Sequence, residues 1–221
     1  MSYKNRFKSV FSQACMFAVL MSGMGVGGVA NAGEGNNECP VGQVNGLTLN
    51  DEFGPGAGDL TKCLERRHNV KVVMQINQFC RDAVPNADCT RPYALGNIRN
   101  MIKDYEITHG MVAGKDYEIV AVVHSGGGYL MLKNEGADGN GAPVSGRNQF
   151  EGAVKGLLAD GVKFYFCQNT TRSFIGSNKL PAVGETTAGA TGELIEGVQY
   201  TTAGVTAIAE FQNRGYRYVQ P

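Results

Sequence analysis

Apolar runs that alternate with helical patterns constrain the fold of this chain more than any other feature of its sequence. Three runs are rich in β-branched or aromatic residues, as buried strands are: VKVVMQIN (residues 70–77), YEIVAVVH (117–124) and VKFYFC (162–167). Apolar residues at helical spacing follow the first two runs, over residues 90–105 and 149–160. The pattern ends with a shorter strand, a helix and a last strand, over residues 198–204, 205–213 and 216–221.

Strands that alternate with helices predict right-handed crossovers and a mostly parallel sheet of roughly five strands, with helices on both faces. In such α/β sheets, ligands bind outside the carboxyl ends of the strands. Three features follow strands at that edge: Cys80 with its loop, His124 with three glycines, and Cys167 with the polar run Gln168-Asn169-Thr170. The sequence therefore predicts a functional site at this edge of the sheet.

The first 32 residues predict a secretory signal peptide, which does not belong to the fold. A basic start contains Lys4, Arg6 and Lys8, an apolar stretch covers residues 10–29, and Ala30-Asn31-Ala32 matches a cleavage site. A transmembrane anchor is the alternative, and the glycines that dilute the stretch argue against it. We therefore expect a periplasmic or secreted protein, with an irregular arm (33–69) before an α/β domain (70–221).

Length and charge narrow the classes of partner. Cleavage would leave about 190 residues, enough for one domain with a sizeable core. It would also remove three basic residues and turn the formal net charge of +0 weakly negative. The sequence has no basic patch of the kind that binds nucleic acid, and no other segment long and apolar enough to span a membrane. We therefore expect no nucleic-acid partner and no membrane span after cleavage.

The chain beyond the leader keeps five cysteines, an odd number that leaves at least one without an intramolecular partner. Cysteines pair readily in exported proteins because their compartment is oxidising. The simplest pairing has two local bridges and leaves Cys167 free; it uses Cys39, Cys63, Cys80 and Cys89. The spacing leaves the connectivity open. Cys80 or Cys89 has the alternative role of a resolving thiol, because both lie toward the predicted functional edge.

Cys167 ends a strand and precedes a polar run, a position that suits a reactive thiol at the sheet edge. A helix that begins near Thr170 would place its N-terminus beside the thiol, where it stabilises a thiolate. His124, if it lies within reach, would also favour the thiolate. The alternative is a small buried hydrophobe, which is how free cysteines commonly behave. The residues alone leave both interpretations open.

The stretch HSGGG (124–128) offers successive glycines, whose N–H groups can form a cradle for a small anion. The residues that we expect to bind are Ser125, Gly126, Gly127, Gly128, Gln168, Asn169 and Thr170. A tight turn after the strand is an equal alternative. The stretch matches neither GxGxxG nor a P-loop, which argues against nucleotide binding. No CxxC or HxxxH spacing predicts a metal site, and no GxSxG elbow predicts a serine hydrolase.

Taken together, these segments resemble the DsrE/DsrF-like sulfur-relay family over roughly residues 70–221. The resemblance is carried by the strand that ends in HSGGG, by GVKFYFCQNT (161–170) and by the ending QNRGYRY (212–218). It implies a three-layer α/β/α fold of the flavodoxin-like kind, a homo-oligomer of three or six copies, and no cofactor. It also implies that the matching cysteine, Cys167, carries sulfur as a persulfide that passes between a donor and an acceptor.

This chain departs from the better-known members of the family by its expected export, its extra cysteines and an insertion around residues 182–196. Export argues against a role in tRNA thiolation, because that reaction is cytoplasmic. We therefore expect a periplasmic sulfur-handling protein with a persulfide on Cys167 and His124 as its catalytic partner. The sulfur donor or acceptor is a protein or a small sulfur species. The alternative is a non-catalytic binding or assembly module with structural disulfides, in which Cys167 is inert.

Overall fold

The computed structural model describes residues 68–80, 89–182 and 187–221 of the chain. The predicted signal peptide (1–32) and almost all of the predicted arm (33–69) lie outside these residues, together with Cys39 and Cys63. The leader, the arm and any bridge between those two cysteines therefore stay predictions.

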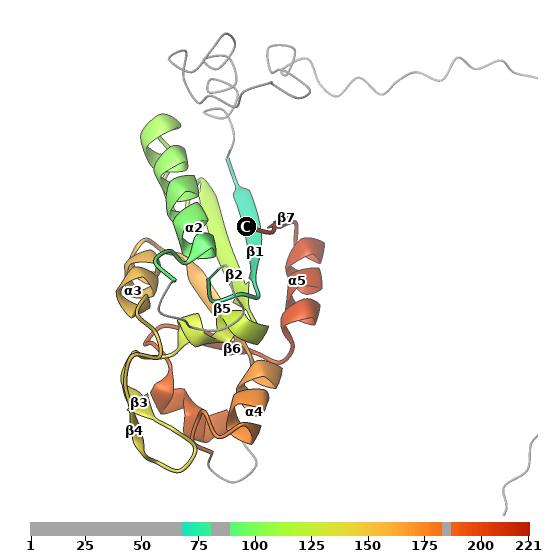
Figure 1. Ribbon diagram of the computed structural model, residues 1–221. Helices are drawn as coiled ribbons and strands as arrows, with labels where there is room; N and C mark the ends of the chain where they lie inside the picture. The colour runs from blue at the N-terminus through green and yellow to red at the C-terminus, as the bar shows by residue number, and fades with distance from the viewer. Residues whose placement is uncertain (1–67, 81–88, 183–186) are drawn as a thin grey trace, which may run out of the picture. The chain divides into compact units, whose positions relative to one another are not determined.

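Five parallel strands form one sheet, in the order β6-β5-β2-β1-β7 (Figure 1). The strands are β1 (Val70–Ile76), β2 (Tyr117–Val123), β5 (Lys163–Cys167), β6 (Gln199–Thr201) and β7 (Arg217–Val219). β2 is the central strand, and each of its residues except Glu118 is buried. Strands covered on both faces need such continuous apolar runs, and the predicted parallel sheet is confirmed.

Helices cover both faces of this sheet, as Figure 1 shows. The helices α2 (Tyr93–Lys103) and α3 (Glu151–Ala159) lie on one face, and α5 (Gly204–Asn213) lies on the other. One stripe of α2 is buried, as its helical spacing predicts. Gly161, with φ +87°, ends the turn after α3, because a glycine adopts this left-handed conformation without strain. The α/β fold is thus confirmed.

The two faces of the sheet carry separate hydrophobic cores of unequal size. The larger core contains Phe164 and Phe166 of β5 together with the buried stripes of α2 and α3. The smaller core is formed by Val73, Val120 and Val122, which pack against Ile208 of α5. Because side chains alternate along a strand, residues two positions from these valines also face α5. This alternation decides which polar side chains meet at the carboxyl edge.

The structure differs from the sequence pattern in three places. The predicted loop over residues 130–148 includes a short hairpin of β3 (Gly136–Ala137) and β4 (Pro143–Val144), and the glycine run before it forms a 3-10 segment, Ser125–Met131. α2 continues into a π-helical turn, Asp104–Thr108. The helix after β5 is α4 (Gln168–Gly176), which begins two residues before the expected start near Thr170. Thr170 and Thr171 are buried, so tertiary packing outweighs their low helix propensity.

Candidate functional site

Four neighbouring strands place polar side chains on the α5 face of the sheet, close to its carboxyl edge. Gln75 of β1 follows Val73 by two residues, and His124 follows Val122 by two. Tyr218 of β7 pairs in register with Val73 and therefore shares its face. On β5, the ring of Tyr165 packs on Phe211 of α5, and Cys167 lies two residues further along. Across the sheet the row is Tyr218, Gln75, His124 and Cys167.

Cys167 is the last residue of β5 and the residue that precedes the first turn of α4. Its side chain is buried, and Sγ accepts a hydrogen bond of 3.2 Å from the backbone N–H of Gly204, the first residue of α5. The first turns of α4 and α5 contain no acidic residue. A helix N-terminus favours negative charge, so this arrangement can stabilise a thiolate. The expected helix N-terminus beside the thiol is therefore present twice, once from each helix.

His124 is half-buried, and both of its ring nitrogens lie within hydrogen-bond distance of a side chain. Nε2 lies 2.7 Å from Nε2 of Gln75, and Nδ1 lies 2.9 Å from Oγ of Ser125. The ring also packs against Gly204, because a Cβ atom on that glycine would come within 3.0 Å of Cδ2 of His124. Burial lowers the pKa of His124 from its ordinary value of 6.5, which favours the neutral imidazole. Direct action of His124 on the thiol stays a prediction.

A pocket of about 490 Å³ opens where these groups meet. His124, Ser125, Cys167, Asn169, Thr170 and Gly204 are among the residues that line it. No lysine, arginine, aspartate or glutamate is among its lining residues in the described part of the chain. The structure therefore brings together the predicted nucleophile, the predicted histidine and three of the seven predicted binding residues in one cavity without formal charge.

The glycines after His124 are placed by close packing. A Cβ atom on Gly127 would lie 2.5 Å from the carbonyl oxygen of Ile76, and one on Gly128 would lie 2.7 Å from the ring of Phe166. The N–H group of Gly127 donates to the carbonyl of His124 over 3.1 Å. This packing explains Gly127 and Gly128 by a tight turn, which was the alternative interpretation. An anion cradle at Gly126, Gly127 and Gly128 stays a prediction, as does binding by Gln168, which lies in the first turn of α4.

Cys80 and Cys89 form a disulfide, with their Cα atoms 5.9 Å apart. This is one of the two local bridges in the simplest predicted pairing. In this disulfide-bonded state neither Cys80 nor Cys89 has a free thiol, which argues against the alternative role of a resolving thiol. Cys167 is the free cysteine of the described residues. No group of three or more metal-binding side chains occurs within the part of the chain that the structure describes. No helix in that part is long and apolar enough to cross a membrane.

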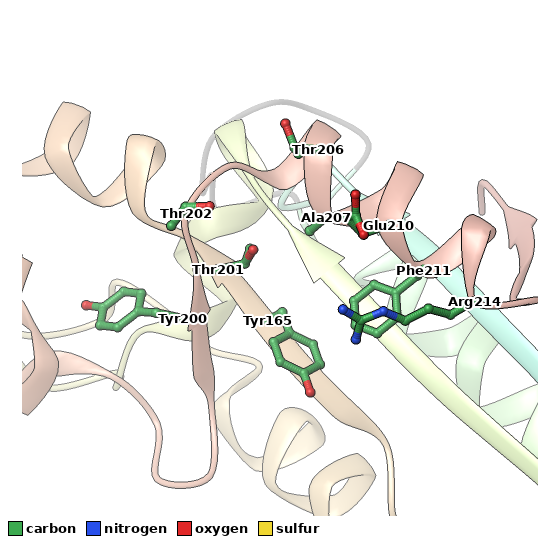
Figure 2. A pocket seen from close by; sticks show the side chains of 9 residues that line it. All are labelled: Tyr165, Tyr200, Thr201, Thr202, Thr206, Ala207, Glu210, Phe211 and Arg214. Carbon is green, nitrogen blue, oxygen red and sulfur yellow. The ribbon is translucent and has the colours of Figure 1, made fainter.

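A second pocket, of about 230 Å³, lies at Tyr165 of β5, before Cys167, on the same face of the sheet (Figure 2). The rings of Tyr165 and Phe211 line it with their centroids 5.4 Å apart, together with the charged groups of Glu210 and Arg214. Tyr200 extends away from Tyr165, and its ring stacks on Phe166 with a centroid distance of 6.0 Å. No cysteine or histidine is among its described lining residues, so the pocket at Cys167 is the candidate for thiol chemistry.

Three residues of the site were not predicted from the sequence: Gln75, Tyr218 and Gly204. The signal for Gln75 was an amide that follows four apolar residues in a predicted strand, and the signal for Gly204 was a glycine at the start of a helical pattern. Tyr218 belongs to the ending QNRGYRY that carries the resemblance, but nothing in that ending indicates a place beside Gln75. Its place depends on β7 pairing with β1, which is a property of the strand order.

Comparison with known proteins places the chain in a family. The model of the DsrE/DsrF-like family matches residues 86–221, a range that includes His124, Cys167 and Gly204. A solved structure of a protein of unknown function from Methanobacterium thermoautotrophicum has 23% sequence identity and a TM-score of 0.46, over 69% of this chain and 100% of that chain. No curated protein matches the chain.

Proposed function

This chain belongs to the DsrE/DsrF-like family, and we propose that it holds sulfane sulfur as a persulfide on Cys167. Members of this family relay sulfur between partner proteins. One observation carries the proposal: the free thiol of Cys167 lies at the carboxyl edge of the sheet, against the N-terminal N–H group of α5 and in the wall of a pocket. This position gives a sulfur atom both a donor for its charge and room for a second sulfur.

The chemistry is an exchange between a thiolate and a persulfide. The thiolate of Cys167 attacks the outer sulfur of a donor persulfide, whose S–S bond breaks as a new S–S bond forms at Sγ. The donor's inner sulfur leaves as a thiolate with the electron pair of the broken bond, so no oxidant or reductant is needed. An acceptor thiolate then takes the outer sulfur by the same step. The N–H group of Gly204 and the N-terminus of α5 favour the negative charge before and after transfer.

Replacement of Cys167 by serine tests this proposal. The purified protein is incubated with glutathione persulfide, freed of excess reagent, and weighed intact without a reducing agent. We expect the wild type to gain the mass of one sulfur atom and Cys167→Ser to gain none. The disulfide between Cys80 and Cys89 is present in both proteins, so it serves as the internal control. Equal sulfur uptake by the two proteins would refute the assignment of Cys167.

A second candidate function is a non-catalytic binding or assembly module with an inert Cys167. The burial of this residue, which is 5% exposed, favours that alternative. Alkylation of the native protein separates the two. A thiol that reacts with iodoacetamide before denaturation supports sulfur transfer, and a thiol that reacts only after denaturation supports the binding module.

We also propose that the protein is exported and works in the periplasm as a homo-oligomer. The disulfide between Cys80 and Cys89 supports export, because such bonds persist in oxidising compartments. The mass of the protein recovered from the periplasm tests cleavage after Ala32, and a mass that includes residues 1–32 would contradict it. Sedimentation of the same material tests the expected trimer or hexamer, and a monomer would contradict that expectation.

A further inference from the structure

A chain of side-chain contacts crosses the sheet and ends at the rim of the pocket. The hydroxyl of Tyr218 donates to Oε1 of Gln75, and it also lies 3.1 Å from Oε1 of Gln220. Nε2 of Gln75 contacts Nε2 of His124, and Nδ1 of His124 contacts Oγ of Ser125. A tyrosine hydroxyl has one proton, and the shorter of its two contacts is with Gln75. The chain therefore starts from a defined donor.

We infer that Ser125 is a hydrogen-bond donor to the ligand of this pocket, and that Tyr218, Gln75 and His124 are positioning residues that fix its direction. With Oε1 of Gln75 accepting from Tyr218, the amide N–H of Gln75 points at Nε2 of His124. Nε2 then accepts and carries no proton, so the proton of the neutral ring is on Nδ1. Nδ1–H donates to Oγ of Ser125, which leaves the serine's own hydrogen for another acceptor.

The surroundings of Ser125 support this assignment. Ser125 has φ +52°, in the left-handed region that residues other than glycine sparsely populate and that is enriched at functional sites. Its backbone N–H donates to Oγ1 of Thr170 over 2.9 Å, which ties it to the first turn of α4. Ser125 is exposed and lines the pocket that Cys167 also lines. Its hydroxyl hydrogen is therefore available to a ligand in that pocket.

The ligand class follows from the groups that line the cavity and rests on the proposed function. The described lining residues carry no formal charge, so recognition depends on neutral donors such as the hydroxyl of Ser125. Such a donor suits the outer sulfur of the Cys167 persulfide, whose negative charge it can share with the N–H of Gly204. The expected benefit of Ser125 is therefore a longer lifetime of the bound outer sulfur.

Nitrogen NMR of the imidazole rings tests the positioning residues without reference to sulfur. In full-length protein labelled with 15N-histidine, we expect His124 to carry its proton on Nδ1 at neutral pH. Tyr218→Phe should weaken this preference, and Gln75→Glu should move the proton to Nε2, because a carboxylate accepts and cannot donate. Tyr93→Phe, at a tyrosine that is 64% exposed on α2, is the matched control and should change nothing. A proton on Nε2 in the wild type would overturn the inference.

The lifetime of the persulfide tests Ser125 itself. After loading with glutathione persulfide, we expect Ser125→Ala to lose its outer sulfur about tenfold faster than the wild type, the effect of one hydrogen bond to a charged acceptor. An unchanged rate overturns the role of Ser125. If the wild type takes up no sulfur, the proposed function fails and the ligand assignment fails with it. The NMR experiment still decides the direction of the hydrogen bonds in that case.

Discussion

The backbone N–H of Gly204 donates a hydrogen bond to Sγ of Cys167 over 3.2 Å, across 37 residues of sequence. This bond joins the end of β5 to the start of α5, and it exists because β6 pairs with β5 and delivers the chain back to the same edge. Neither residue has a charged neighbour among the lining residues of the described pocket. The donor that meets the sulfur of Cys167 is therefore a main-chain group.

Gly204→Ala should disturb the site because a methyl group would come within 3.0 to 3.2 Å of the His124 ring. We expect a loss of about 1 kcal/mol in the free energy of unfolding, since crowding in a packed core costs more than the helix gains from alanine. Urea unfolding measures the loss. The NMR signals of the His124 ring should shift in the same variant.

Gly152→Ala is the matched control for this change. Gly152 lies near the N-terminal end of α3 as Gly204 does in α5, and a Cβ atom there would meet nothing within 4 Å. Alanine should stabilise the protein at that position by about 0.5–1 kcal/mol. If Gly204→Ala were as stabilising as the control, the close contact with His124 would be wrong.

Gly127→Ala should destabilise the fold by about 2–3 kcal/mol, because the new methyl group would lie 2.5 Å from the backbone oxygen of Ile76, which cannot turn aside. Thermal unfolding followed by circular dichroism measures the effect, with Gly96→Ala on α2 as the open-space control. An anion cradle would give the opposite result, with sulfur loading weakened at unchanged stability.

Asn148 should be sensitive to the loss of its donor group. It is fully buried, and its Nδ2 donates to the carbonyl oxygens of Leu130 and Leu132 over 2.9 and 2.7 Å. Asn148→Asp would place a carboxyl group against two carbonyl oxygens, and we expect a cost of about 3 kcal/mol at neutral pH.

The pH dependence identifies the cause of that cost. Burial and the two carbonyls raise the pKa of the introduced carboxyl in the folded state, so the penalty should grow as pH rises above about 4 and shrink below it. Asn148→Ala lacks this titration and should show a loss that does not vary with pH. Urea unfolding between neutral and acidic pH compares the two, and parallel curves would contradict the explanation.

Glu193 should contribute to stability only while it is ionised. Burial opposes its charge, but hydrogen bonds from the N–H of Ala137 and from Arg147, the latter 2.5 Å long, hold the pKa of Glu193 below its ordinary value of 4.5. A lowered carboxyl pKa gives stability that is present above about pH 4.5 and is lost as pH falls through the folded value. Glu193→Gln should therefore cost about 2 kcal/mol at pH 7 and much less under acid. The exposed Glu196→Gln is the control, and a difference that stayed constant with pH would exclude this mechanism.

The fold was largely predictable because short apolar runs rich in β-branched or aromatic residues are typical of buried strands. The observed β1 and β2 each end one residue before the predicted strand, and β5 begins one residue after it. The start of α4 was predicted near Thr170, two residues late, since the polar sequence after Cys167 resembles a loop until its threonines are buried by the rest of the fold. The π-helical turn Asp104–Thr108 likewise has no pattern of its own.

The candidate site was predictable only in part. The rule that ligands bind at the carboxyl ends of parallel strands correctly brought Cys167 and His124 to one edge. The partners of His124 required knowledge of strand order, because Gln75 and Tyr218 are 143 residues apart and meet only where β7 pairs with β1. The N–H of Gly204 points at Sγ of Cys167 because of the way α5 packs on the sheet, and no local sequence pattern indicates that packing.

The donor that meets Cys167 is a main-chain group, and every residue except proline carries that group. Side-chain replacement at position 204 therefore changes the room beside the His124 ring and leaves the donor in place. At position 204 the side chain sets the available space, while the hydrogen-bond donor is supplied by the backbone. A change of residue at this position can therefore alter which ligand fits the pocket, while the N–H donor beside Cys167 persists for every residue except proline.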